Sequence, residues 1–295
     1  MIDVGCSLAL VLLLVAVVAA YVVRVLFRGE AHYARVEAAG SSPLLGRRLM
    51  EMAYWSLQPV ARLCIRLGLG PNAITGISMG LALLAAVALA FGHFGVAALL
   101  TAVASLGDAL DGLVARSTGA ASGAGEVLDA TVDRYSEGAF LTGLAIYFHD
   151  SVAMLCIVLA AILGSFMVSY ATAKAEASQA EVPRGWMRRS ERAVYLNVGV
   201  ALVPLAGACL PNDGAMRLVS TAPIALAVGI VALFSNVSAI RRLRALARTL
   251  RARDAASPLP RAPLSGDEQA EEQGAAMAAS ATTSGIGSGA TPAAS

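Results

Sequence analysis

Long apolar runs separated by short polar segments make up most of this chain. Six of these runs are each close to the roughly 20 residues that an α-helix needs to cross a bilayer. They cover residues 71–92, 96–115, 124–147, 151–172, 192–210 and 219–239. A further run, 5–27, precedes them. The pattern predicts an all-α integral membrane protein: a bundle of six core transmembrane helices with an additional N-terminal anchor helix.

Between the first run and the other six, apolar residues recur at helical spacing among arginines. The apolar positions are Leu45, Leu49, Met52 and Trp55, and the basic ones are Arg47, Arg48, Arg62 and Arg66. A helix with one apolar face and a basic polar face is typical of the membrane interface. We therefore predict an interfacial amphipathic helix here. A helix that packs on a soluble partner is the alternative.

Composition agrees with a membrane protein. Hydrophobic residues make up 57% of the 295 residues and charged residues 14%. The mean hydropathy is +0.69, well outside the range of ordinary soluble domains. The net charge of +2 gives no indication of nucleic-acid binding. The four cysteines have no metal-type spacing, so we expect neither zinc nor a disulfide framework.

These patterns divide the chain into four parts. We expect a transmembrane anchor at 1–35, the interfacial amphipathic helix at 36–68, a six-helix domain at 69–240, and a basic and then disordered cytoplasmic tail at 241–295. The first run resembles a secretory signal only in length, because Arg24, Arg28 and Arg35 follow it instead of preceding it. A retained anchor is therefore the preferred interpretation.

Basic residues indicate the orientation of the bundle. When the predicted helices are threaded back and forth, one side of the membrane receives Arg116, Lys174, Arg184, Arg188, Arg189, Arg192, Arg241, Arg242 and Arg244. The opposite turns contain a single arginine, Arg217. The positive-inside rule assigns the arginine-rich side to the cytoplasm. We expect a multi-pass protein of a bacterial-type cytoplasmic membrane, with its C-terminus in the cytoplasm.

Four aspartates lie inside two of the apolar segments. Asp108 and Asp111 are three residues apart, and Asp129 and Asp133 are four apart, so each pair shares one face of a helix. A carboxylate in a spanning helix costs roughly 2.5–3.5 kcal/mol unless it lies near the interface and has partners. The connection between the two helices is short, so we expect antiparallel neighbours whose carboxylates converge. Converging carboxylates without histidine or cysteine favour Mg²⁺ or Mn²⁺, completed by water and substrate phosphates.

Two glycines flank these aspartates. Gly112 follows Asp111, and Gly125 precedes Asp129 by four residues. Glycine within a helix costs about 1 kcal/mol relative to alanine, which favours a local reason for its presence. Close approach of a ligand is one reason, and close packing of two helices is the other.

Eight positions together form a recognisable signature. They are Asp108, Asp111, Gly112, Ala115, Arg116, Gly125, Asp129 and Asp133, in the spacing D-x2-D-G-x2-A-R-x8-G-x3-D-x3-D. This pattern resembles the signature of the CDP-alcohol phosphatidyltransferases, and the resemblance covers roughly 69–240, including the sequence PNAIT at 71–75.

The resemblance implies a role for each matching residue. Asp108, Asp111, Asp129 and Asp133 would bind one or two Mg²⁺ or Mn²⁺ ions, and Asp133 would also act as the general base. The nucleotide of a CDP-linked lipid donor would lie against Asp111, Gly112, Ala115, Arg116 and Gly125. The reaction would transfer the lipid phosphate to an alcohol with release of CMP. The family also implies a homodimer surrounded by membrane lipids.

A second cluster of charge, at 169–196, concerns the acceptor alcohol. Its pattern resembles family members that use inositol phosphate, and a small anionic acceptor would explain several cations. Arg189, Arg192 and Lys174 are the candidate acceptor-binding residues. Glycerol 3-phosphate is also anionic, and the same charges serve as topology determinants, so both of these readings stay open. The alternative function is a membrane cation transporter that uses the intramembrane carboxylates.

Overall fold

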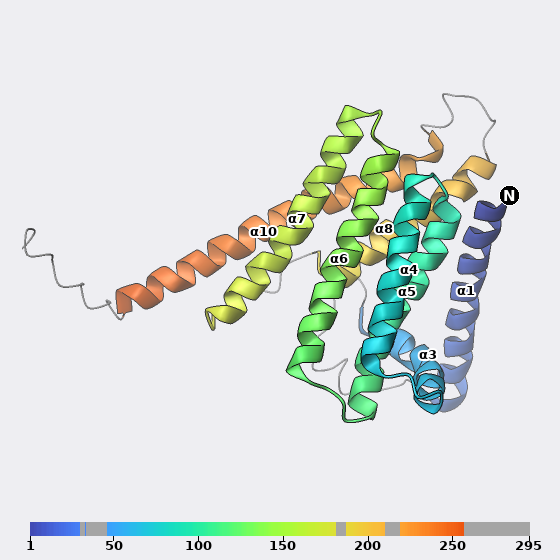
Figure 1. Cartoon of the computed structure of the whole chain (residues 1–295), viewed down its shortest axis with the longest axis horizontal. Helices are drawn as coiled ribbons and strands as arrows, with labels where there is room; N and C mark the ends of the chain where they lie inside the picture. Colours follow the sequence, from blue (N-terminus) through green and yellow to red (C-terminus); the bar gives the residue numbers. More distant parts are fainter. Residues whose placement is uncertain (30–32, 34–45, 181–186, 210–218, 257–295) are drawn as a thin grey trace, which may run out of the picture. The chain divides into compact units, whose positions relative to one another are not determined.

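The computed structural model describes residues 1–29, 33, 46–180, 187–209 and 219–256. Arg35, Arg184 and Arg217, the first part of the 36–68 segment and the expected disorder after residue 256 lie outside the described residues. The described helices are α1 (Ile2–Arg28), α3 (Gly46–Arg66), α4 (Pro71–Ala90), α5 (Phe94–Ser117), α6 (Gly123–Tyr147), α7 (Val152–Ala177), α8 (Arg189–Ala208) and α10 (Ala222–Ala256) (Figure 1). A helix therefore lies at each of the six expected core segments and at both preceding segments.

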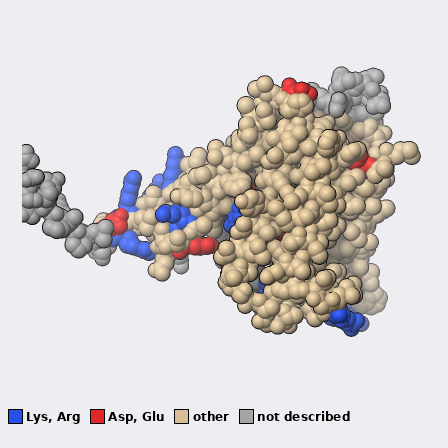
Figure 2. Space-filling model, viewed as in Figure 1, with Lys and Arg blue, Asp and Glu red and all other residues tan. Residues whose placement is uncertain are grey.

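The all-helical character of the fold is confirmed in the described residues, which contain no strand. Five helices, α1, α4, α5, α7 and α10, are long and apolar enough to cross a bilayer. The helices α6 and α8 are not among these five, and each carries several charged residues in its N-terminal part. Most of the surface of the bundle in Figure 2 carries no charged side chain. A surface of this kind suits contact with lipid, because lipid tails cannot solvate a charged side chain.

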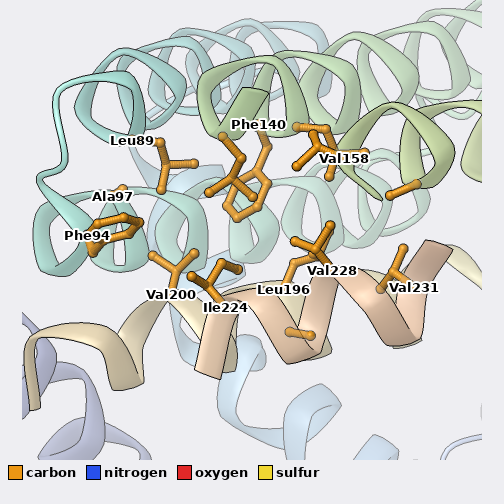
Figure 3. Packing of buried hydrophobic residues seen from close by; sticks show 14 of the residues in the cluster. Leu89, Phe94, Ala97, Phe140, Val158, Leu196, Val200, Ile224, Val228 and Val231 are labelled. Atoms are coloured by element: carbon orange, nitrogen blue, oxygen red, sulfur yellow. The ribbon is translucent and has the colours of Figure 1, made fainter. Parts of the chain in front are cut away.

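The core of the bundle lies where the six helices α4 to α8 and α10 meet. Its buried side chains include Leu89, Phe94, Ala97, Phe140, Val158, Leu196, Val200, Ile224, Val228 and Val231 (Figure 3). Small residues bring the backbones together, as is common between helices in lipid. At Gly143 of α6 an added Cβ would collide with the backbone carbonyl of Ala86 in α4. This close packing joins α6 to α4 at the end of α6 away from its aspartates.

The anchor helix α1 packs against α5 and α8. Its Asp3 carboxylate accepts hydrogen bonds from the backbone N–H groups of Gly95, at 2.9 Å, and Val96, at 3.2 Å. These amides are among the first of α5, which have no partner within their own helix. The side chain of Asp3 thus caps α5 from a different helix, so α1 is a packed part of this bundle.

The amphipathic helix α3 covers the acidic end of α5. Leu57 and Ala61 of α3 are buried against Ile74 of α4 and against Leu110 and Val114 of α5. Of the apolar positions predicted for this segment, Met52 and Trp55 pack with Tyr21 of α1, Leu49 is exposed, and Leu45 lies outside the described residues.

The chain divides into two compact units, Met1–Ala247 and Arg248–Ser295. The described part of the second unit, 248–256, is helical. The domain boundary expected after residue 240 falls within α10, which continues to Ala256. A charged segment extends a helix readily because lysine and arginine are good helix formers.

Candidate active site

The four aspartates lie on the C-terminal half of α5 and the N-terminal half of α6. We expected these two helices to pack directly against each other. Instead, α4 is the close packing neighbour of both. The arrangement leaves room for a cavity between the acidic stretches of α5 and α6 while keeping the aspartates near one another.

Asp111 is the most buried of the four, with 4% of its surface exposed. Its Oδ2 accepts a hydrogen bond of 2.5 Å from the Thr75 hydroxyl, and its Oδ1 one of 2.5 Å from the N–H of Gly112. These two hydrogen bonds fix the orientation of the Asp111 carboxylate. One of them comes from Thr75 of α4, which belongs to the PNAIT sequence.

Arg189, the first residue of α8, lies between two other aspartates. Its Nη2 is 2.7 Å from Oδ2 of Asp108 and 2.5 Å from Oδ1 of Asp133. Each of these two carboxylate side chains is 13% exposed. One guanidinium nitrogen therefore joins α5, α6 and α8 through two largely buried carboxylates, although the Arg189 side chain itself is 39% exposed.

A cavity of about 550 Å³ opens beside Asp111 and Asp129. We call it the glycine-rich cavity. All five residues predicted to contact the nucleotide line it: Asp111, Gly112, Ala115, Arg116 and Gly125. The guanidinium of Arg116 donates to the Tyr54 hydroxyl at 2.9 Å, so the amphipathic helix α3 holds this arginine in place.

The two glycines of the signature do not serve tight packing between helices. The nearest atoms to a Cβ built on Gly112 belong to the Arg116 guanidinium, and the nearest to one on Gly125 is the Ser122 hydroxyl oxygen. Both are polar side-chain groups at the wall of the glycine-rich cavity. Between the two readings of these glycines, the geometry favours close approach of a ligand.

A second cavity, of about 450 Å³, lies between α6, α7, α8 and α10. Its charged lining residues are Arg134, Glu176, Arg188, Arg189, Arg192 and Arg242. We call it the arginine cavity. Five arginines against one glutamate give this cavity a strongly basic lining, and guanidinium groups match phosphate oxygens in geometry and charge.

The predicted acceptor-binding residues are placed differently from one another. Arg189 lines the arginine cavity and also contacts the aspartates. Arg192 lines it too, but this residue is only 1% exposed, and its Nε and Nη2 donate to Glu137 at 2.5 and 2.7 Å. Lys174 is exposed on α7 and is not among the residues that line the cavity.

The structure adds site residues that sequence reasoning missed. Arg242 of α10 lines the arginine cavity and donates to Thr172 at 2.7 Å, although its position in the sequence indicated only membrane topology. Thr75 and Tyr54 each contact a signature residue. The signal for Thr75 was its place in PNAIT, whereas no pattern along the chain pointed to Tyr54 or Arg242.

The donor set fits a divalent cation. All four candidate ligands are carboxylates, which suit Mg²⁺ and Mn²⁺, and Asp129 interacts electrostatically with both Asp108 and Asp111. Oδ1 of Asp133 is buried and lies 2.5 Å from Nη2 of Arg189, so a positive charge already occupies a place where a cation would bind. Our expectation of complete convergence is wrong in one respect. Within the described ranges no three such side chains are already close enough to hold a metal. Arg189 lies between two of them, Asp108 and Asp133.

Comparisons with known proteins agree with this geometry. Residues 69–237 match the sequence model of the CDP-alcohol phosphatidyltransferase family. The chain is 35% identical over 164 residues to the phosphatidylinositol phosphate synthase of Corynebacterium glutamicum, covering 54% of this chain and 75% of that protein. It is 33% identical over 141 residues to the archaetidylinositol phosphate synthase of Pyrococcus horikoshii, covering 48% of this chain and 73% of that protein.

Solved structures with the same fold include a phosphatidylinositol phosphate synthase of Mycobacterium tuberculosis. Its crystal structure with CDP-DAG bound has a TM-score of 0.57 and 26% identity, covering 64% of this chain and 92% of that chain. Its structure in complex with manganese and citrate has the same score and identity and covers 88% of that chain. The signature, the two cavities and these relatives support one conclusion. The chain belongs to the CDP-alcohol phosphatidyltransferases, divalent-metal-dependent membrane enzymes that transfer a phosphatidyl group from a CDP-linked lipid to an alcohol.

Proposed function

We propose that this enzyme transfers the phosphatidyl group of CDP-diacylglycerol to a phosphorylated inositol and releases CMP. The observation that carries this proposal is the arginine cavity, because its lining residue Arg189 also contacts Asp108 and Asp133. An acceptor whose phosphate dianion binds in this cavity would place its hydroxyl group near Asp133. The names of the relatives, which are phosphatidylinositol phosphate and archaetidylinositol phosphate synthases, support the same acceptor class.

We assign the donor nucleotide to the glycine-rich cavity. Gly112, Ala115 and Gly125 leave its wall open, so a ribose or base can approach the backbone. Arg116, held by Tyr54, supplies a positive charge at this wall. Asp111, fixed by Thr75, faces the same space.

We assign the metal to Asp108, Asp111, Asp129 and Asp133. A divalent cation bound there would neutralise the negative charge on the pyrophosphate and on the departing CMP. Asp133 would accept the proton of the acceptor hydroxyl. The hydroxyl oxygen then forms the new bond to the lipid phosphorus, and the bond between this phosphorus and the oxygen of CMP breaks. A positioned base of this kind contributes roughly 10²–10⁴-fold to the rate.

We assign the acceptor phosphate to Arg134, Arg189 and Arg242. Arg192 has two guanidinium nitrogens committed to Glu137 and a third to the carbonyl of Met187 at 2.8 Å. We therefore give Arg192 the role of a positioning residue that fixes the start of α8. No acceptor contact is assigned to Lys174, which is exposed outside the cavity.

We propose that α6 and α8 also cross the membrane, which gives six core spans beside the anchor α1. Their charged residues face the cavities and partners described above, so crossing exposes little of this charge to lipid. The active site lies on the cytoplasmic side, where the basic residues gather and the water-soluble acceptor and CMP are available. The assembly is a homodimer, as the family resemblance implies, and its mass in nanodiscs measures this directly.

The test is the lipid product. Purified protein in nanodiscs receives CDP-diacylglycerol, Mg²⁺ and equal amounts of inositol 1-phosphate, inositol and glycerol 3-phosphate, and mass spectrometry identifies the lipids formed. We expect phosphatidylinositol phosphate, at a rate that Asp133→Asn lowers by at least about 100-fold. A product from glycerol 3-phosphate or free inositol instead would refute the proposed acceptor, and equal CMP release by the wild type and Asp133→Asn would refute the role of Asp133.

A further inference from the structure

Arg189 belongs to two sites at once. Its guanidinium bridges Asp108 and Asp133, and the same side chain lines the arginine cavity. It is also the first residue of α8 and follows a non-helical residue, Arg188. Its side chain is 39% exposed and is therefore not fully enclosed by the packed bundle.

Asp108 and Asp133 need a positive charge beside them. Asp108 and Asp133 are each 13% exposed, so water screens them poorly. Like charges this close repel strongly at low dielectric. The charged groups that act on Asp133 are the arginines Arg189 and Arg134 and the carboxylates of Asp108 and Asp129. Arg134 also donates a 2.6 Å hydrogen bond to the Ala130 carbonyl of its own helix, whereas Arg189 contacts both members of the pair directly.

A guanidinium and a divalent cation therefore compete for the same oxygens. We propose that Arg189 is an exchange residue. It holds Asp108 and Asp133 together until a divalent cation takes its place, and the released guanidinium then binds the phosphate of the acceptor in the arginine cavity. This inference rests on the proposed function, and it adds that the cation and the anionic acceptor bind cooperatively through one side chain.

Linkage makes the proposal quantitative. If the cation frees Arg189 for the acceptor, the acceptor must tighten the binding of the cation by the same factor. Couplings between ligands are typically about 5-fold to 150-fold. Loss of the guanidinium removes the competitor, so the cation should bind more tightly, while the acceptor should bind more weakly and no longer respond to the cation.

The experiment measures binding and needs no turnover. Wild type, Arg189→Gln and Arg188→Gln are prepared in nanodiscs, and electron paramagnetic resonance of free Mn²⁺ gives the Mn²⁺ affinity of each. Arg188→Gln is the matched control, because it removes an equal charge from a neighbouring residue that lines the same cavity but does not bridge the aspartates. Calorimetry then gives the affinity for inositol 1-phosphate with and without Mn²⁺.

We expect Arg189→Gln to bind Mn²⁺ at least about 5-fold more tightly than the wild type, and Arg188→Gln to change the affinity much less. In the wild type, Mn²⁺ should strengthen the binding of inositol 1-phosphate, and Arg189→Gln should abolish this effect. Arg189→Lys, which keeps one cationic nitrogen, should restore an affinity for Mn²⁺ close to that of the wild type.

Three results would overturn the inference. Weaker Mn²⁺ binding in Arg189→Gln would mean that Arg189 organises the metal site, and equal tightening in Arg188→Gln would mean that only general repulsion acts. Binding of inositol 1-phosphate that ignores Mn²⁺ in the wild type would remove the coupling itself. The proposed function survives each of these results if the wild type still forms phosphatidylinositol phosphate, whereas it fails with the inference if the wild type binds no Mn²⁺ and releases no CMP.

Discussion

The buried ion pair between Arg192 and Glu137 yields a prediction whose size follows from the structure. Arg192 is 1% exposed, and its Nε and Nη2 pair with the two oxygens of Glu137 at 2.5 and 2.7 Å. Replacement of Arg192 by methionine preserves most of the volume and removes the charge. The carboxylate of Glu137, 13% exposed, then loses its partner. Removal of one member of a buried pair costs about 3–5 kcal/mol, because the other charge remains uncompensated.

Replacement of both members by apolar residues should cost much less. In Glu137→Leu combined with Arg192→Met, no buried charge is left, and such exchanges are often neutral or stabilising. The Met187 carbonyl loses one hydrogen bond in the single and in the double variant, a loss of about 1 kcal/mol. We therefore expect the double variant to be at least about 2 kcal/mol more stable than Arg192→Met alone.

The assay is equilibrium unfolding in mixed micelles of a mild detergent and dodecyl sulfate, followed by tryptophan fluorescence. Wild type, both single variants and the double variant form a complete thermodynamic cycle. A single variant Arg192→Met as stable as the double variant would refute the reasoning, because Glu137 would then have no need of a partner.

The pair of Arg192 and Glu137 should also affect the reaction, and this effect can be measured separately from its effect on stability. Asp133 and Glu137 are one turn apart on α6, and Arg189 and Arg192 are one turn apart on α8, so the two ion pairs set the register between these helices. A folded double variant should therefore have a higher KM for the acceptor. An unchanged KM for the acceptor would show that packing alone sets this register.

Three further predictions concern the donor site and the packing of the bundle. Tyr54→Phe removes the acceptor of the Arg116 hydrogen bond and should raise the KM for CDP-diacylglycerol by roughly 3-fold to 10-fold with little change in the KM for the acceptor, whereas an equal rise in both would point to a general loss of structure. Gly143→Ala places a methyl group against a backbone carbonyl of α4 and should destabilise the fold by about 1–3 kcal/mol, while Gly80→Ala, which meets open space, should not; equal effects in unfolding titrations would contradict the packing argument. Asp3→Ala removes the cap of α5 and should cost about 0.5–2 kcal/mol in the same titration, and an unchanged midpoint would show that α1 does not stabilise α5.

Much of the candidate site was predictable from local spacing. Asp108 and Asp111 are placed on one face of α5 by helical geometry, whereas the signature glycines were expected beside the nucleotide because of the family resemblance. The contacts of Arg192 were not predictable in this way. Its role as an acceptor ligand was inferred from charge, yet the structure gives it Glu137, a residue 55 positions away in the sequence.

The sequence by itself determined where the helices lie and on which faces charge is gathered, but not the length of α10, which continues to Ala256. These properties follow from short-range rules: 3.6 residues per turn decides which side chains share a face, and the thickness of a bilayer decides how long an apolar run must be. Only the tertiary structure decided that α4 packs against both acidic helices, that Tyr54 holds Arg116, and that Arg189 lies between Asp108 and Asp133. The physical reason is that long side chains from different helices choose their partners by the packing of the whole bundle, and no periodicity along the chain records that packing.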